Sequence, residues 1–317
     1  MAYSTLSFRI FFSSALTLLT LLASCVTDSD SKTAFDEIIE QDTIRVGAYR
    51  FNVRMAGPQD GPLVILLHGF PQTSYSYRHQ LVTLADAGYR AVAPDMRGYS
   101  PEARPKSVEA YRMEHLVSDV IGIADVFKAQ RFDLVGHDWG AAVGWTVAAT
   151  APDRVKSFTA LSIPHLTAFQ AAMSDPKCQQ DKKSAYIQEF VKPNSEDIYL
   201  KNDRAGLRMI YRDMDQNEVE EYLRVLGNKE ALGSALNWYR ANFGPDAGKG
   251  GIGKVKVKTL FVWGAQDPAV GACAAQSSGQ YVDEDRYEFK TLPDSGHWLL
   301  ETDRELISSW ILNHIKG

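Results

Sequence analysis

The chain has 317 residues, of which 45% are hydrophobic and 23% are charged, and it carries a formal net charge of -5 at pH 7. This composition is ordinary for a globular protein with a large core and excludes a disordered or fibrous chain. A slightly acidic balance without a long basic run also excludes an electrostatic surface for nucleic acid.

The N-terminal residues predict export. Arg9 precedes an apolar stretch, residues 10–22, that is too short to cross a bilayer comfortably. The stretch ends in Leu22-Ala23-Ser24-Cys25, which resembles a bacterial lipobox, whose cysteine is lipidated and becomes the new N-terminus. We therefore expect a lipoprotein-type signal peptide over residues 1–25 and a tether over residues 26–35. The protein would then be lipid-anchored or periplasmic in the bacterial cell envelope, and a plain secretory signal with an incidental cysteine is the alternative.

In that compartment the other two cysteines meet an oxidising environment. Cys178 and Cys273 are even in number, but their separation alone does not decide between a disulfide and two partly buried thiols. Neither has a CxxC partner, and the seven histidines show no HExxH or similar spacing. The sequence therefore supports no metal site, and no cofactor is expected.

Beyond residue 62, short apolar runs alternate with segments of helical periodicity. The runs predict buried strands at residues 63–67, 91–94, 132–135, 155–161 and 259–263, and a later strand is expected at residues 286–292. Strand and helix in alternation predict an α/β fold, with a parallel sheet flanked by helices on both faces. Catalytic groups are then expected on the loops at the carboxyl ends of the strands.

The strand pattern stops after residue 163. From there to residue 253 the chain is polar, helical in its periodicity and rich in tyrosine, and it ends in a glycine-dense stretch. This segment, residues 163–253, is predicted to be a helical cap. It interrupts a core domain made of residues 36–162 and 254–317.

A sharp turn follows the strand at residues 132–135. Its sequence, Gly136-His137-Asp138-Trp139-Gly140, has the Gly-x-Nuc-x-Gly spacing of a nucleophile elbow, where small residues must flank a strained turn. Asp138 occupies the position of the nucleophile. Because an aspartate before a helix more often caps that helix, the interpretation depends on the elements around it.

A second loop can face this elbow. The strand at residues 63–67 leads into His68-Gly69-Phe70-Pro71, and this loop can turn the Phe70 amide toward the elbow, with the Trp139 amide as its partner. Two such donors form an oxyanion hole, worth on the order of 3 to 4 kcal/mol per donor in a transition state. His68 is interpreted as a structural histidine that fixes the loop.

Two later strand ends supply an acid and a histidine. The strand at residues 259–263 leads to Asp267, and the strand at residues 286–292 leads to Ser295-Gly296-His297-Trp298. The chain order of nucleophile, acid and histidine separates this arrangement from other triad folds. His297 is then the predicted base and Asp267 its orienting partner.

Together these motifs resemble the epoxide hydrolases of the α/β-hydrolase fold, which have haloalkane and haloacetate dehalogenases as close relatives. The resemblance runs from about residue 51 to the C-terminus and implies that fold, with a mostly parallel sheet and an inserted helical cap. Epoxide hydrolases of this type carry two cap tyrosines that donate to the epoxide oxygen. Residues 237–240, Asn-Trp-Tyr-Arg, are similar to one of these sites and indicate Tyr239, whereas Tyr186 fits the looser pattern of the other.

The resemblance implies a two-step reaction on a small apolar epoxide. A carboxylate with an ordinary pKa near 3.9 is an anion at pH 7, so Asp138 could attack a saturated carbon without a base. Tyr186 and Tyr239 would protonate the leaving oxygen, and His297, oriented by Asp267, would activate water against the resulting ester.

The pocket and two alternative functions complete the prediction. Trp238 and Phe190 are expected to line the substrate pocket. A dehalogenase would use the same Asp138 but release halide, which binds N–H donors such as Trp139. A lipid-anchored binding protein without turnover is the alternative of another class, and no oligomeric state is predicted.

Overall fold

The computed structural model describes residues 1–2, 35, 37–245 and 251–317. Residues 3–25 of the expected signal peptide, which include Cys25, and most of the tether lie outside the described residues, so export and lipidation stay predictions. Within the described ranges, no helix has the length and the apolar character needed to cross a membrane.

In the described part of the chain, eight strands form one sheet with the order β1-β2-β4-β3-β5-β6-β7-β8. Their bounds are β1 (Glu40–Val46), β2 (Tyr49–Ala56), β3 (Leu63–Leu67), β4 (Arg90–Pro94), β5 (Phe132–His137), β6 (Val155–Leu161), β7 (Lys258–Gly264) and β8 (Tyr287–Leu292). Strands β3 to β8 are parallel, whereas β1 and β2 pair antiparallel with their neighbours. The mostly parallel sheet, the five strands expected from apolar runs and the later strand at residues 286–292 are confirmed. The hairpin of β1 and β2 was not predicted, because most of β1 is exposed and it therefore has no apolar run.

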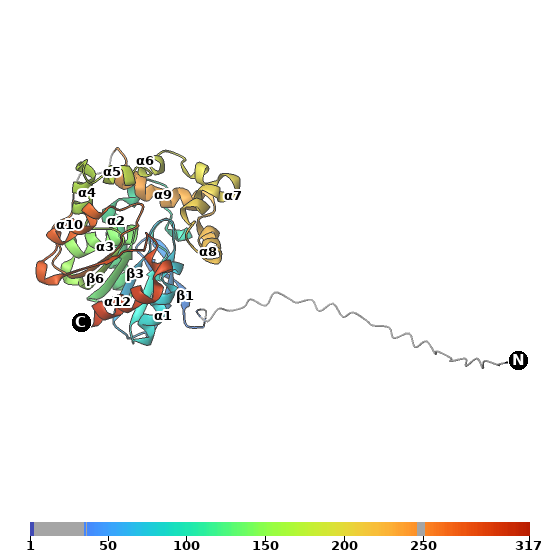
Figure 1. Ribbon diagram of the computed structural model, residues 1–317. Coiled ribbons are helices and arrows are strands. Elements are labelled where there is room, and N and C mark those ends of the chain that lie inside the picture. The colour runs from blue at the N-terminus through green and yellow to red at the C-terminus, as the bar shows by residue number, and fades with distance from the viewer. Residues whose placement is uncertain (3–34, 36, 246–250) are drawn as a thin grey trace.

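Core helices cover both faces of the sheet (Figure 1). Their bounds are α1 (Arg78–Asp86), α2 (Met113–Val126), α3 (Trp139–Thr150), α10 (Ala272–Ser277), α11 (Leu299–Thr302) and α12 (Arg304–Lys316). Alternate residues of β3 show why both faces are covered: Ile65 packs into the apolar cluster that includes α2 and α3, and Val64 packs into the one that includes α1 and α12. A strand that is buried on both sides needs a continuous apolar run, which is what residues 63–67 provide.

Between β6 and β7 lie the helices that we call the cap. Their bounds are α4 (Leu166–Ser174), α5 (Gln180–Lys183), α6 (Ile187–Phe190), α7 (Glu196–Ile210), α8 (Gln216–Leu226) and α9 (Lys229–Phe243). Figure 1 shows them together over one end of the sheet. A disulfide between Cys178 in the cap and Cys273 on α10, with a Cα–Cα distance of 5.5 Å, joins the two parts. The sequence had left this bridge open.

Candidate active site

The turn between β5 and α3 has the strained geometry of an elbow. Asp138 has φ +50° and ψ -121°, a region that non-glycine residues rarely occupy. Its carboxylate accepts a hydrogen bond from the amide of Phe70, on another loop, rather than capping α3. Helix α3 lies very close to the end of β3 here: a Cβ added to Gly140 would lie 2.0 Å from the carbonyl oxygen of Leu67. The carboxylate is therefore free of the capping role that its position allowed.

The loop after β3 holds one oxygen of this carboxylate. The Phe70 amide donates to Oδ1 of Asp138 at 2.8 Å, and a Cβ added to Gly69 would lie 2.3 Å from the Asp138 Cβ. Trp139 is the first residue of α3, so its amide has no hydrogen-bond acceptor within the helix. Nε2 of His68 accepts from the Met96 amide at 3.0 Å, so its Nδ1 carries the proton and donates to a backbone carbonyl at 2.9 Å. His68 is thus structural, as expected.

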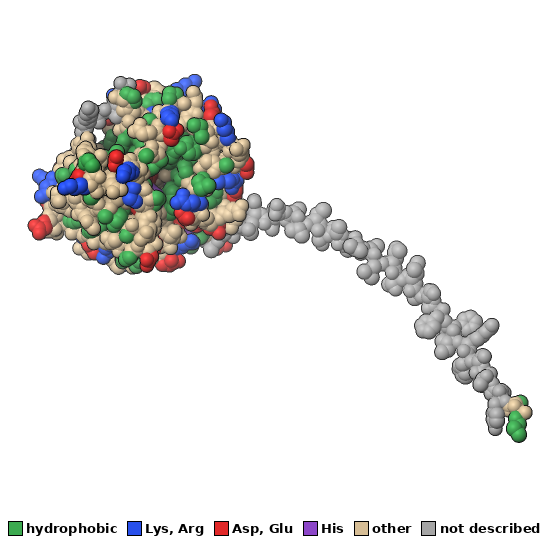
Figure 2. Space-filling view, turned by 45° about the horizontal axis from the view of Figure 1, so that its top comes forward, with side chains coloured by type: hydrophobic (Ala, Val, Ile, Leu, Met, Phe, Trp, Pro, Cys, Tyr) green, Lys and Arg blue, Asp and Glu red, His purple; other side chains and the backbone are tan. Residues whose placement is uncertain are grey.

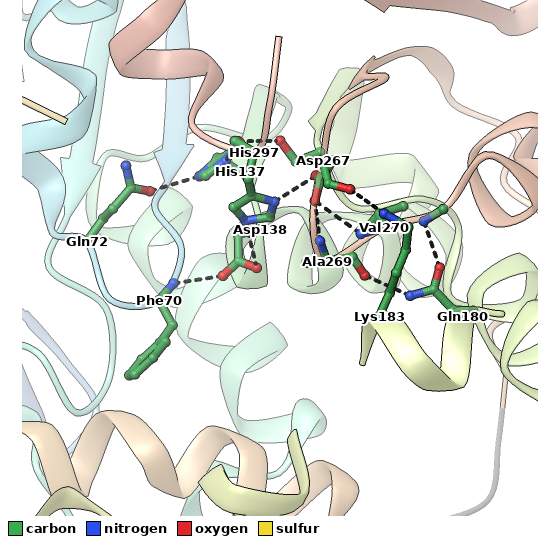
Figure 3. Close-up of polar contacts among 12 residues, drawn as sticks. Phe70, Gln72, His137, Asp138, Gln180, Lys183, Asp267, Ala269, Val270 and His297 are labelled. Carbon is green, nitrogen blue, oxygen red and sulfur yellow. Dashed lines mark hydrogen bonds and ion pairs between the residues drawn. The ribbon is translucent and has the colours of Figure 1, made fainter. Parts of the chain in front are cut away.

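Two side chains from neighbouring strand ends complete a line of contacts (Figure 3). Nδ1 of His297 lies 2.8 Å from Oδ2 of Asp267, and its Nε2 lies 3.4 Å from Oδ2 of Asp138. The other oxygen of Asp267 accepts from the amides of Ala269 and Val270 at 2.7 and 3.1 Å. The structure therefore brings Asp138, His297 and Asp267 together, as the sequence had predicted.

The charges in this line of contacts favour an ion pair between Asp138 and His297. Burial alone would lower the pKa of His297, but the charges and hydrogen bonds of Asp267 and Asp138 outweigh burial and raise the pKa to about 10. Burial in turn raises the pKa of Asp138, yet its hydrogen bond to His297 and the charge there lower it below the ordinary value. At neutral pH, Asp138 is an anion beside an imidazolium.

A cavity of about 680 Å³ opens beside Asp138. Figure 2, which turns the cap side forward, shows hydrophobic side chains around a hollow in this face. The lining includes Asp138, the two predicted tyrosines, and mainly apolar residues: Tyr186, Tyr239, Trp139, Met113, Thr146, Leu166, Phe169, Met173 and Phe243. Burial raises the pKa of both phenols, and the negative charge of Asp138 raises it further. Both tyrosines therefore keep their hydroxyl protons at neutral pH.

The predicted pocket residues Trp238 and Phe190 require a correction. In the described residues, the cavity lining does not include either of them. Trp238 is buried behind the lining, where its Nε1 donates to the carbonyl oxygen of Arg97 at 2.8 Å. Phe190 packs edge-on against Tyr239, with ring centroids 4.8 Å apart. Both support lining residues instead of contacting the cavity, and sequence cannot separate these two roles because both require a buried aromatic ring.

Sequence reasoning also missed a buried histidine beside the nucleophile position. Nε2 of His137 lies 2.8 Å from the carbonyl oxygen of His297, which accepts its N–H, and its Nδ1 lies 2.8 Å from Oε1 of Gln72. Burial and the charge of His297 lower the pKa of His137 to about 4. Its position inside the elbow was the only available signal.

Comparisons with known proteins agree with the fold. The sequence profile of the alpha/beta hydrolase fold family matches residues 62–303. The chain belongs to this family. AB hydrolase superfamily protein YfhM of Bacillus subtilis is 31% identical to this α/β hydrolase over 285 residues, which cover 86% of the chain and 97% of the relative.

Epoxide hydrolases are among the relatives of this α/β hydrolase. Epoxide hydrolase A of Mycobacterium tuberculosis is 30% identical over 311 residues, covering 84% of the chain and 94% of the relative. A solved structure described among novel epoxide hydrolases from hot-environment metagenomes has a TM-score of 0.77 and 28% identity, over 88% of this chain and 99% of that one. The resemblance that the motifs indicated is therefore confirmed at the level of family.

Proposed function

We propose that this α/β hydrolase opens an epoxide to a vicinal diol through a covalent ester on Asp138. The main support is that the Asp138 carboxylate and the phenols of Tyr186 and Tyr239 line one apolar cavity. Epoxide opening needs a nucleophile and a proton donor together, because the leaving oxygen stays on the substrate. The names of the similar proteins point the same way.

In the first half-reaction, Oδ2 of Asp138 attacks one carbon of the ring, because Oδ1 is occupied by the Phe70 amide. The carbon–oxygen bond of the ring breaks, and its electron pair moves to the oxygen, which takes a proton from Tyr186 or Tyr239. Ester formation removes the charge of Asp138, one of the causes that raise the pKa of both phenols. The phenols therefore become stronger acids as the new bond forms.

Esterification also converts His297 into a base. The charge of Asp138 and its hydrogen bond are two of the causes that keep the pKa of His297 high, and both are lost in the ester. The imidazolium can then return a proton to the tyrosinate and become neutral. It next takes a proton from water, whose oxygen attacks the ester carbonyl while the Phe70 and Trp139 amides hold the oxyanion. Collapse releases the diol, protonated by His297, and the proton left on Asp138 restores the imidazolium.

The decisive experiment traps the ester. The His297→Gln variant, mixed with an epoxide, is expected to add the mass of the substrate to the peptide that contains Asp138. The Asp138→Asn variant is the matched control and stays unmodified. A single turnover of wild-type protein in heavy-oxygen water should label Asp138; label found only in the diol contradicts the covalent route.

The same assay tests the alternatives. Epibromohydrin carries both a ring and a halogen, so bromide release with an intact ring would favour a dehalogenase. A peptide that stays unmodified with several epoxides and haloalkanes would favour a binding protein without turnover.

A further inference from the structure

The loop that carries Asp267 is held by the cap as well as by the core (Figure 3). Within this loop, residues 265–271, the amides of Ala269 and Val270 donate to the Asp267 carboxylate. The position of that carboxylate therefore depends on the path of these few backbone atoms. On their other side lies a short cap segment, residues 178–184, which includes α5.

Gln180 binds this loop through both ends of its amide. Its Nε2 donates to the carbonyl oxygen of Ala269 at 2.7 Å, and its Oε1 accepts from the amide of Gly271 at 2.8 Å. The side chain is completely buried, and a third bond, from Nε2 to the Ser184 hydroxyl at 2.9 Å, fixes its rotamer. Ala269 is thus held twice, by Asp267 at its N–H and by Gln180 at its carbonyl.

Two further links lie on either side of Gln180. Nζ of Lys183 donates to the backbone carbonyl of Asp267 itself at 2.7 Å. Cys178 forms the disulfide with Cys273, two residues beyond Gly271. The three links span the loop from the residue that contacts His297 to the start of α10, so the segment fixes the loop at both ends.

We propose that cap residues 178–184 are a positioning element for Asp267, and that the Cys178–Cys273 disulfide makes water activation in this enzyme sensitive to reduction. This inference rests on the proposed function. Gln180 and Lys183 are positioning residues, since they act on the reaction only through Asp267 and His297. A dithiol supplies two electrons and two protons, which convert the bridge into two thiols and remove the covalent link between the segment and α10.

The two half-reactions should respond differently. Asp267 orients His297, and His297 acts as a base only after the ester has formed. A loosened loop therefore slows ester hydrolysis and leaves the attack of Asp138 largely unchanged. A purely structural role would instead lower both rates together, because unfolding removes active protein from both steps.

The test measures the two rates separately, by stopping the reaction of full-length protein at short times and weighing the Asp138 peptide. Gln180→Met and Lys183→Met are expected to slow ester decay by about tenfold, part of the 10² to 10⁴ that acid–base catalysis contributes. Ester formation should stay within about twofold on the same scale. Lys182→Met removes an exposed neighbouring charge on α5 and should match the wild type. Lys183→Arg keeps a donor and should restore most of the decay rate.

A second arm tests the disulfide. Wild-type protein treated with a dithiol should accumulate ester like the Cys178→Ser/Cys273→Ser double variant, and the double variant should not respond to the dithiol. Equal rates in oxidised and reduced wild type, or a parallel fall in both half-reactions, would overturn the proposal.

A third readout does not depend on the substrate. The Nδ1 proton of His297, shared with Asp267 at 2.8 Å, is expected to give a low-field NMR signal. This signal should broaden in Lys183→Met and on reduction but persist in Lys182→Met. If no epoxide forms an ester with wild type, the proposed function fails, whereas the behaviour of this signal still decides whether the cap segment positions Asp267.

Discussion

Nε2 of His297 lies 3.4 Å from Oδ2 of Asp138, with both side chains more than nine-tenths buried. This contact pairs an imidazolium with a carboxylate in an apolar setting, where each charge depends on the other. Loss of the aspartate charge, by mutation or by ester formation, therefore changes the protonation state of the histidine. The proposed reaction uses this dependence to turn an acid into a base.

The first prediction measures that dependence directly. Asp138→Asn keeps the size of the side chain and removes its charge, so the pKa of His297 should fall below its value of about 10. This pKa should stay above that of a histidine buried without a charged partner, because Asp267 still contacts Nδ1. NMR titration of labelled histidine reports the change, and the exposed Asp153→Asn variant is the control.

The raised pKa of His297 also makes the stability of the protein depend on pH. The folded pKa of His297 lies above the ordinary 6.5, so its contribution to the free energy of unfolding is complete below pH 6.5 and is lost as the pH rises toward 10. Asp138→Asn should weaken this dependence. An unchanged titration of His297 in the variant would contradict the pairing.

The second prediction concerns the proton donors. Tyr239→Phe or Tyr186→Phe should slow ester formation by about tenfold, and the double variant by about 10³-fold, because a remaining phenol can still donate to the leaving oxygen. Mass spectrometry in the His297→Gln background measures the step without hydrolysis. Tyr199→Phe, on a half-buried cap residue that packs against Phe190, is the matched control. Equal rates in the His297→Gln background, the two single tyrosine variants and their double variant would exclude the two tyrosines as donors.

Local sequence patterns predicted the fold and the elbow of this protein, but they did not predict contacts between segments that are distant in the sequence. The strand ends and the elbow were predictable because each depends on residues next to one another, such as Gly136 and Gly140 around Asp138. The contact of Gln180 with Ala269 joins residues 89 positions apart. Nothing in the sequence around either residue encodes it, since the cap helices must pack before the two can meet.

Trp238 was predicted to line the pocket but packs behind it. Trp238 and Tyr239 are neighbours on α9, and the rotation of about 100° between successive residues of an α-helix directs their side chains to different sides. One of them lines the cavity and the other packs behind it. Periodicity places residues on faces of a helix but does not say which face meets the site.

The third prediction tests the close approach of the two loops. In Gly69→Ala, the added methyl would lie 2.3 Å from the Cβ of Asp138, so the Phe70 loop must move away from the carboxylate. We expect a loss of about 1 to 3 kcal/mol in the free energy of unfolding, as for other overpacked sites. Ester formation should also slow, because the Phe70 amide no longer fixes Oδ1.

The control for this variant is Gly253→Ala, where an added Cβ meets no atom of the described residues within 4 Å. Denaturant unfolding and peptide mass measure the two effects. Wild-type stability in Gly69→Ala would show that the loops can separate without cost.

The last prediction concerns Glu301, a buried acid that links cap and core. Its Oε1 accepts from the hydroxyl of Tyr222 on α8 at 2.7 Å and from the amide of Gln72 at 2.5 Å, while Oε2 has no partner within the described residues. Burial is the main cause that raises its pKa from 4.5 to about 7. Between these values the folded protein holds a proton that the unfolded chain has lost, so stability falls as the pH rises from 4.5 to 7. The full difference corresponds to about 3 kcal/mol.

Glu301→Gln mimics the protonated acid and should remove this fall. Its free energy of unfolding should match that of wild type at pH 5 and exceed it at pH 8, as measured by denaturant titration at both values. Glu305→Gln, on an exposed residue of α12, should follow the wild-type pH dependence. Parallel curves for wild type and Glu301→Gln would mean that Glu301 is ionised throughout, and that Tyr222 and Gln72 hold it as a carboxylate.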